Sequence, residues 1–479
     1  MMLALILVPL AVALLSLVLP WRLALVLNAL GALTTLALAG VLAAGVLAGD
    51  APPTTLRGYL RGDDLGLTLA VVVSAAASVA ACIGVASFGA ARDARRYTVL
   101  AAALLWALLS TTLADHLGVM WITMELSAVF GAFLVGSRGD KPALEAAFKY
   151  MILGSVGLVI GLLATALVHR VGGGAGLGAG DGALSFLRLR AAGHALTSGP
   201  LRIAFALAVA GYGLKVGLFP LHVWKPDAYA AAPAPVTALL AGAAVAVPLG
   251  AILRFGALAS AAGEGALVSH VFVTLGLGSL LAATLLAARE RDFRRILAFT
   301  SVEHMGLILL ACGLEPDAVR GGLLHLLTNG TLKALAFGLL GFVVSARGSA
   351  DSRSGPGLYA GSPALAAVFL VTMAAALGFP PFGMFASELT VLRALFAADH
   401  VVVGLLVTLV LAVIFGVVIA ATLRVVFARA DQPLPGPAAH RTAPLAIGVP
   451  VLLAMVWVGV GLPGELWSQL GDVARGLAP

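Results

Sequence analysis

Charged residues are scarce in this chain of 479 residues. They make up 11% of the sequence, whereas an average globular domain has about 25%, and hydrophobic residues make up 61%. A soluble protein of this length would be unable to cover its surface with so few charges. The composition therefore excludes an ordinary soluble protein and predicts an all-α protein that crosses a membrane many times.

Cysteine is scarcer still, since Cys82 and Cys312 are the only two. Both lie in apolar segments, and no Cys-x-x-Cys pair exists, so a zinc or iron–sulfur ligand set is excluded. Carboxylates are also too scattered to predict a Na⁺ or Ca²⁺ cage. We expect no metal and no cofactor on this chain. The net charge of +7 comes from basic residues scattered among short loops, which predicts no nucleic-acid partner.

Long apolar runs make up most of the sequence. A spanning helix needs roughly 20 mostly apolar residues. The sequence offers about fourteen such runs, at 2–20, 23–48, 66–91, 97–114, 116–136, 143–169, 201–224, 233–255, 267–288, 294–313, 319–345, 363–387, 400–428 and 443–462. The first run lacks a basic segment before it, so we interpret it as a spanning helix and not as a signal peptide.

The charged residues in the loops predict how the protein is oriented in the membrane. An even number of spans places both termini on one side. Alternate loops then carry sixteen Lys and Arg residues on one face, Lys225 and the loop arginines 429 and 441 among them, and ten on the other, Arg254 among them. The positive-inside rule puts the richer face in the cytoplasm. We therefore expect a multi-pass protein of the bacterial cytoplasmic (inner) membrane with both termini on the outer, periplasmic side.

Two apolar runs contain a glycine–proline interruption. One is at Pro220 and the other at Pro380 and Pro381, about 160 residues later. Five helices separate them, so the two runs have opposite orientations, and paired broken helices in inverted repeats are typical of transport proteins. Unrelated proline kinks are the alternative. The predicted organisation is helices one to three (1–95), a first five-helix repeat (96–256), a second inverted repeat (257–430) and a last helix with its tail (431–479).

A few ionisable residues lie inside the apolar runs, where each costs about 2.5–3.5 kcal/mol. Carboxylate, lysine and histidine side chains spread over several helices suit proton transfer. The main candidates are Glu125, Lys215, His304, His325, Lys333 and Glu388, and the secondary ones are Glu145, Lys149 and Glu303.

Each candidate also has a structural explanation. Glu145 and Lys149 are four residues apart and can neutralise each other. Glu303 can lie at the water interface, and buried histidines are often hydrogen-bonded core residues. Glu125 and Lys215 can form a structural ion pair between helices, although such a pair leaves the ionisable groups on the later helices unexplained.

Four segments resemble a known family. They are residues 211–229 (GYGLKVGLFPLHVWKPDAY), 299–306 (FTSVEHMG), 325–335 (HLLTNGTLKAL) and 376–388 (ALGFPPFGMFASE). These segments resemble the antiporter-like subunits of respiratory complex I, a superfamily shared with Mrp cation/proton antiporters and group 4 [NiFe]-hydrogenases. The likeness extends over about residues 70–430. Segments 125–150 and 300–306 look most like hydrogenase-4 component F of formate hydrogenlyase-type complexes.

The resemblance implies a proton-translocating subunit of a redox-driven oxidoreductase complex that performs no redox chemistry itself. One proton half-channel would surround Glu125 and Lys215 and a second Lys333 and Glu388, with His304 and His325 as relays. His222 and Asn329 become secondary candidates. The [NiFe] and iron–sulfur centres would belong to partner subunits, which include other membrane subunits and a peripheral cytoplasmic arm. A Mrp-type Na⁺/H⁺ antiporter subunit, a complex I subunit and a non-pumping structural subunit remain alternatives.

The chain departs from the family pattern at four positions. The family's lysine in the eighth helix falls on Ala246, and a position that is often histidine is Asn329. Lys225 and Tyr229 replace the usual leucine and histidine after the first helix break. These replacements keep the non-pumping alternative open.

Overall fold

The computed structural model describes residues 1–178, 180–428, 434 and 442–479, and they are almost entirely helical. Each of the fourteen predicted runs falls on one helix or on consecutive helical pieces. Ten helical stretches of the described chain are long and apolar enough to cross a membrane. The all-α, multi-pass class is therefore confirmed, while the number fourteen stays a prediction.

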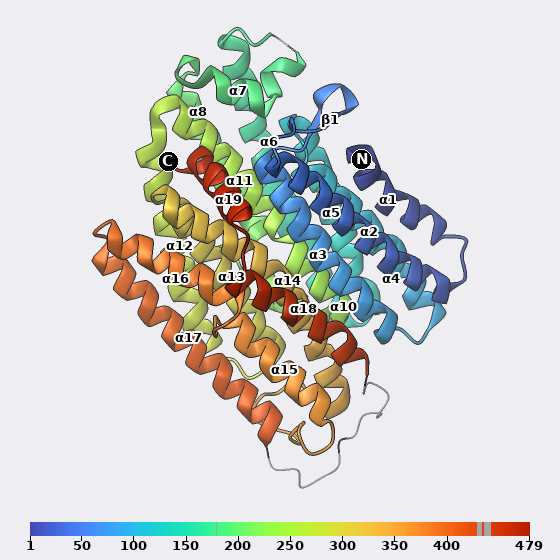
Figure 1. The fold of residues 1–479 in the computed structure, drawn as a ribbon. Coiled ribbons are helices and arrows are strands. Elements are labelled where there is room, and N and C mark those ends of the chain that lie inside the picture. Colours follow the sequence, from blue (N-terminus) through green and yellow to red (C-terminus); the bar gives the residue numbers. More distant parts are fainter. Residues whose placement is uncertain (179, 429–433, 435–441) are drawn as a thin grey trace.

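The first half of the chain, up to the first helix break, lies mostly on one side of the molecule (Figure 1). A small hairpin of β1 (Thr54–Thr55) and β2 (Leu60–Arg61) is inserted between the second and third helices. The helices are α1 (Met2–Leu15), α2 (Trp21–Leu47), α3 (Asp64–Ser87), α4 (Ala91–Thr112), α5 (Leu117–Val135), α6 (Lys141–Gly174), α7 (Phe186–Ala192) and α8 (Ser198–Val216).

The second half supplies the centre and the opposite side (Figure 1). Its helices are α9 (Trp224–Ala231), α10 (Ala234–Leu239), α11 (Ala246–Ala259), α12 (Gly265–Ala287), α13 (Phe293–Cys312), α14 (Pro316–Arg347), α15 (Pro363–Ala376), α16 (Gly383–Ala397), α17 (Val401–Phe427), α18 (Ala443–Val460) and α19 (Gly464–Leu477). A π-helical turn, Leu240–Ala244, joins α10 to α11.

Helices α13 and α14 form the core. Nearly every side chain of α13 is buried, whereas α2 and α17 expose many apolar side chains, as expected for lipid-facing helices. Small residues permit the closest approach: a Cβ added to Gly330 of α14 would lie 2.8 Å from the carbonyl oxygen of Gly242. The core helices therefore pack backbone against backbone.

Both predicted helix interruptions are confirmed. Helix α8 ends at Gly217, with φ of +72°, and the chain then passes Pro220 into α9. Helix α15 ends before Gly378, with φ of +71°, and the chain passes Pro380 and Pro381 into α16. A left-handed backbone favours glycine, because a Cβ would clash there. The inverted relation between the two regions remains a prediction.

The two termini lie on the same face of the molecule, together with α7 and the β-hairpin (Figure 1). This arrangement agrees with an even number of crossings. Arginines 429 and 441, and the predicted boundary between residues 430 and 431, lie outside the described residues.

Lys225 and Arg254, which we expected in loops, are buried. Arg254 lies within α11, 2% exposed, and donates to both carboxylate oxygens of Asp63 at 2.6 and 2.8 Å. Lys225 lies in α9 with none of its surface exposed. Their loop assignment was wrong because neighbouring helices, which the linear sequence does not show, cover both side chains.

Candidate functional site

The six main candidates lie on five helices that meet around α13 and α14. Glu125 is on α5, Lys215 on α8, His304 on α13, His325 and Lys333 on α14, and Glu388 on α16. Both histidines and both lysines are buried, and the two glutamates are half-buried. The fold thus brings ionisable groups from distant parts of the chain into its interior.

The first group centres on Lys215. Its Nζ lies 5.8 Å from the ring centre of Tyr150 and has no hydrogen-bond partner among the described residues. Glu125 acts on Lys215 electrostatically, but its Oε1 accepts a hydrogen bond from Ser155 Oγ at 3.1 Å. Within the described chain the two charges form no ion pair at 4.0 Å or closer. A direct structural ion pair is therefore not what the fold builds.

The second group centres on Lys333. Its Nζ donates a hydrogen bond to Thr300 Oγ1 of α13, and that hydroxyl donates to the Leu297 carbonyl. Glu303, one turn further along α13, interacts electrostatically with Lys333 and is 1% exposed. The interpretation of Glu303 as an interface residue is therefore wrong.

A directional chain of hydrogen bonds connects the histidines. Ser387 Oγ donates its one hydrogen to the Met384 carbonyl at 2.6 Å, so it accepts from His325 Nδ1 at 2.9 Å. His325 Nδ1 then carries a hydrogen, and in the neutral ring Nε2 is the acceptor. It accepts from His304 Nδ1 at 3.0 Å. His304 Nε2 is left as a bare acceptor with no partner in the described part of the chain.

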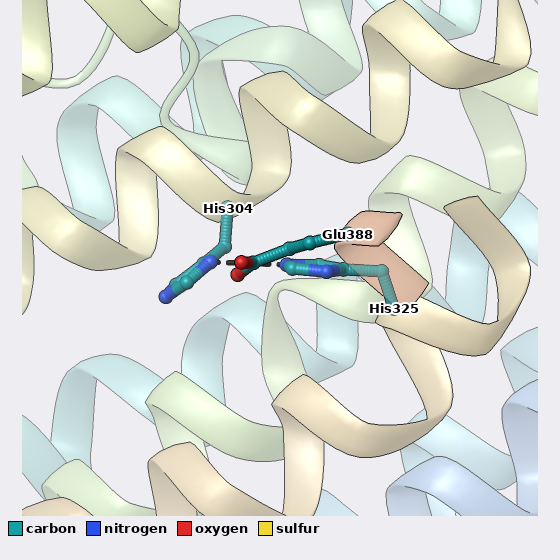
Figure 2. A group of neighbouring side chains, drawn as sticks. All are labelled: His304, His325 and Glu388. Atoms are coloured by element: carbon teal, nitrogen blue, oxygen red, sulfur yellow. Dashed lines mark hydrogen bonds between the residues drawn. The ribbon is translucent and has the colours of Figure 1, made fainter. Parts of the chain in front are cut away.

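Glu388 lies beside this chain. Figure 2 shows the side chains of His304, His325 and Glu388 pointing toward one another. One ligand atom from each lies within 4.8 Å of the others, a spacing that can hold a metal ion. The two histidine nitrogens that face each other are, however, engaged in their mutual hydrogen bond, so the geometry fits a proton relay directly. Our expectation that the chain binds no metal stays a prediction.

Glu145 and Lys149 belong to a separate network at the surface. Lys149, 46% exposed, pairs with Glu145 at 2.8 Å and with Asp227 of α9 at 3.0 Å, and Arg295 pairs with Asp227 at 2.7 Å. Burial raises the pKa of the Asp227 carboxyl, but the hydrogen bonds from Arg295 and Lys149 outweigh this, so its pKa lies below the ordinary value of 3.8. The network attaches α9 to α6 and α13 and lies apart from the buried groups.

The remaining secondary candidates are buried. The ring of His222 packs near Phe219 and Phe299, and its Nδ1 has no partner among the described side chains. Asn329 lies on α14 between His325 and Lys333, and neither atom of its amide is hydrogen-bonded within the described chain. Both lie close in sequence to the main candidates, His222 just after the first helix break and Asn329 on α14 itself.

The sequence interpretation missed four participants: Lys225, Thr300, Ser301 and Ser387. Lys225 Nζ donates to the Ser301 carbonyl at 3.4 Å. The three hydroxyl residues carry no charge, so nothing in the sequence distinguishes them from the many others in apolar helices. Lys225 did carry a signal, because it replaces an apolar residue in the segment that follows the helix break.

A broken-helix membrane fold with buried lysine, glutamate and histidine groups defines the class of antiporter-like membrane subunits. Residues 114–416 match the family described as "NADH:quinone oxidoreductase/Mrp antiporter, TM". The chain belongs to this family, as the resemblance predicted, and is an antiporter-like subunit of the complex I, Mrp and group 4 hydrogenase superfamily.

Individual relatives agree with this assignment. The chain is 34% identical over 304 residues to a hydrogenase-4 component F homolog of Methylacidiphilum infernorum, an alignment that covers 63% of this chain and 64% of that protein. The match thus spans less than two-thirds of that relative. In fold, the chain resembles a chain of the Mrp complex from Dietzia sp. DQ12-45-1b, with a TM-score of 0.84, 20% identity, and 99% and 97% of the two chains covered.

A chain of respiratory complex I from Thermus thermophilus is also similar, with a TM-score of 0.75 and 25% identity. The superposition covers 98% of this chain and 100% of that one. The described fold is therefore shared along nearly its full length with chains of multi-subunit membrane complexes.

Proposed function

We propose that this chain moves protons across the membrane as one subunit of a redox-driven complex of the group 4 hydrogenase type. The supporting observation is a series of buried ionisable groups on α5, α8, α13, α14 and α16, several with unpaired polar atoms. Those atoms belong to Lys215, His222, Glu303, His304 and Asn329. Buried polar groups without protein partners require water. A hydrated row of titratable groups is what proton transfer needs.

The histidine chain supports transfer in its part of the route. A proton that reaches the bare Nε2 of His304 makes that ring cationic. The ring can then release its Nδ1 hydrogen to His325 Nε2, and His325 can release its own Nδ1 hydrogen to the Glu388 carboxylate beside the pair. One proton enters and one leaves, while each ring returns to a neutral state with its hydrogen on the other nitrogen.

A hydrogenase-4 component F homolog is among the relatives, which supports a proposal for the partners. The [NiFe] and iron–sulfur centres would belong to partner subunits of a peripheral cytoplasmic arm. Other membrane subunits would flank this chain in the inner membrane. The chain itself would perform no redox chemistry and bind no cofactor. Electron transfer in the partners would change the balance between Glu125 and Lys215.

A Mrp-type Na⁺/H⁺ antiporter subunit is the second candidate, supported by the description of the matching family, which names the Mrp antiporter. Mass spectrometry of proteins that co-purify in mild detergent separates the two. A nickel–iron subunit and iron–sulfur proteins support the first proposal, and small Mrp-type membrane subunits alone support the second.

The function is tested with Lys215→Ala in the purified complex, reconstituted in vesicles. We expect proton uptake to fall by roughly tenfold or more, while the redox site still turns over with an artificial acceptor. Lys149→Ala is the matched control, because its ammonium belongs to the surface network. Normal pumping by the Lys215 variant would contradict the proposal and favour a structural subunit.

A further inference from the structure

Lys225 is the buried cation that the proposed route leaves unused. Its side chain has no exposed surface, and its Nζ has one hydrogen-bond acceptor within the described residues, the Ser301 carbonyl at 3.4 Å. No carboxylate of the described chain lies within ion-pair distance of it. A buried ammonium without a counter-charge is costly, and ionisable groups at such depth usually mark ion pathways.

The helix break positions this side chain. A Cβ built on Gly217 would lie 3.0 and 3.1 Å from Cδ and Cε of Lys225. The aliphatic part of the lysine therefore lies directly over the left-handed glycine that ends α8. The hydrogen bond to the Ser301 carbonyl then holds the amine of Lys225 against α13.

Lys225 also lies within electrostatic reach of the second group. It interacts with Lys333 of α14, with His304 of α13 and with His222 in the turn before α9. The next long helix along the chain, α11, contains no lysine, and its first residue, Ala246, is buried. Lys225 thus supplies a titratable amine near the centre of the molecule, where α11 supplies none.

A cavity gives this lysine a connection to the surface. Tyr229 lies one turn after Lys225 on α9 and is buried, and its hydroxyl has no hydrogen-bond partner among the described residues. Its ring also lines a cavity of about 240 Å³ that is bordered by Arg138 and Arg294. These arginines lie at the face that carries the basic loops, so water in the cavity can reach the neighbourhood of Lys225.

We propose that Lys225 is a proton-carrying site beside the Lys333 group and exchanges protons with water in the cavity through Tyr229. The step is balanced: the ammonium gives one proton to water or to a neighbouring base and becomes a neutral amine, and it later accepts one proton from water. This inference rests on the proposed function, since a subunit that moves no protons has no use for such a site.

The test replaces Lys225 in the intact complex reconstituted in vesicles. Lys225→Met keeps the apolar length of the side chain and removes the amine, and Lys225→Gln is a second neutral variant in case the first fails to assemble. Lys225→Arg keeps the charge but holds its proton. We expect all three variants to transport protons at about a tenth of the wild-type rate or less, with redox turnover retained.

The outcomes separate the inference from the proposed function. Loss of transport in Lys215→Ala together with wild-type transport in Lys225→Met overturns the inference and leaves the function standing. Wild-type transport in Lys225→Arg also overturns it, because charge alone would then suffice. Wild-type transport in Lys215→Ala overturns the function itself.

The access route has its own variant. Tyr229→Phe removes only the hydroxyl of this cavity-lining residue, which is buried and has no partner among the described residues, and we expect a severalfold lower transport rate. Tyr359→Phe is the control, because Tyr359 is exposed on the loop before α15. An unchanged rate in Tyr229→Phe overturns access through Tyr229.

Discussion

Ser387 shows how a single neutral side chain can set the direction of a proton relay. Its hydroxyl has one hydrogen, which the Met384 carbonyl accepts, so the oxygen accepts from His325. This assigns the hydrogen of each neutral histidine to its Nδ1. The orientation of the pair therefore depends on a serine that has no charge of its own.

Replacing this serine should disturb the relay without breaking the fold. In Ser387→Ala, His325 Nδ1 loses its acceptor, and we expect the proton transport rate to fall about tenfold, which corresponds to ~1.4 kcal/mol. Transport is measured in reconstituted vesicles. The control is Thr390→Val on the same helix, whose hydroxyl binds only the Ala386 carbonyl of its own helix. Equal rates in the two variants would contradict the assigned direction.

The single residue Asp227 makes a pH-dependent contribution to the stability of the folded protein. Its pKa is lowered in the folded protein, so its ion pairs stabilise the fold above the ordinary value of 3.8 and are lost as the pH falls through the folded pKa. We expect Asp227→Asn to lower the free energy of unfolding by about 1 kcal/mol at pH 7.

The difference in unfolding midpoint between the wild type and the Asp227→Asn variant should stay constant from neutral pH to about pH 5 and shrink below about pH 4. Thermal unfolding in detergent at several pH values measures it. Asp140→Asn, at the N-terminus of α6, serves as a comparison for loss of a carboxylate that lies outside this network. A difference in unfolding midpoint that grows as the pH falls would contradict the predicted sign of this pH dependence.

At the scale of secondary-structure elements, the two broken helices have the same local construction. Each ends at a left-handed glycine, and each glycine leaves room for an ionisable side chain from the helix that follows. Lys225 lies over Gly217, and the carboxylate of Glu388 lies over Gly378. The break thus does more than bend the chain, because it also creates the space in which a charged group is held.

Gly378→Ala tests this role. A Cβ would overlap the Glu388 carboxylate, and the φ of +71° disfavours alanine by about 1–2 kcal/mol. We expect a lower unfolding midpoint and loss of proton transport. Gly416→Ala on α17 is the control, since its Cβ would meet no atom within 4 Å. Equal behaviour of the two variants would contradict the proposed role of the break.

On the scale of the whole molecule, an ion pair between a buried arginine and a partly buried aspartate connects parts of the chain that are far apart in sequence. Arg254 of α11 binds Asp63, which precedes α3, and donates to the Thr112 carbonyl at the end of α4. Removing one partner of a buried pair usually costs about 3–5 kcal/mol. This pair therefore holds the start of α3 and the end of α4 against α11.

The orientation in the membrane is tested by labelling with a membrane-impermeant maleimide. We expect Gly199→Cys, at the start of α8, to react in intact cells and Lys141→Cys, at the start of α6, to react only after permeabilisation. Both are made in a Cys82→Ala background, where the remaining Cys312 is buried. The opposite pattern would place the termini in the cytoplasm.

The sequence by itself determined the class of protein, the two helix breaks and most of the ionisable groups that lie inside the apolar helices. These features depend on local chemistry. An apolar run of sufficient length can span a bilayer, and a proline cannot continue a helix. A charged side chain inside an apolar helix is energetically costly, so it usually has a function. The six main candidates were recognisable for that last reason.

Only the tertiary structure decided which charges are buried and which groups touch. Lys225 and Arg254 looked like loop residues, yet neighbouring helices cover them, and Lys149 looked intramembrane but pairs with Asp227 at the surface. The serine that orients the histidines was invisible in the sequence, because its role depends on the distance between α14 and α16. The burial of a side chain and its distance from other groups arise from packing between segments that are far apart in the chain. A local sequence pattern therefore does not predict them.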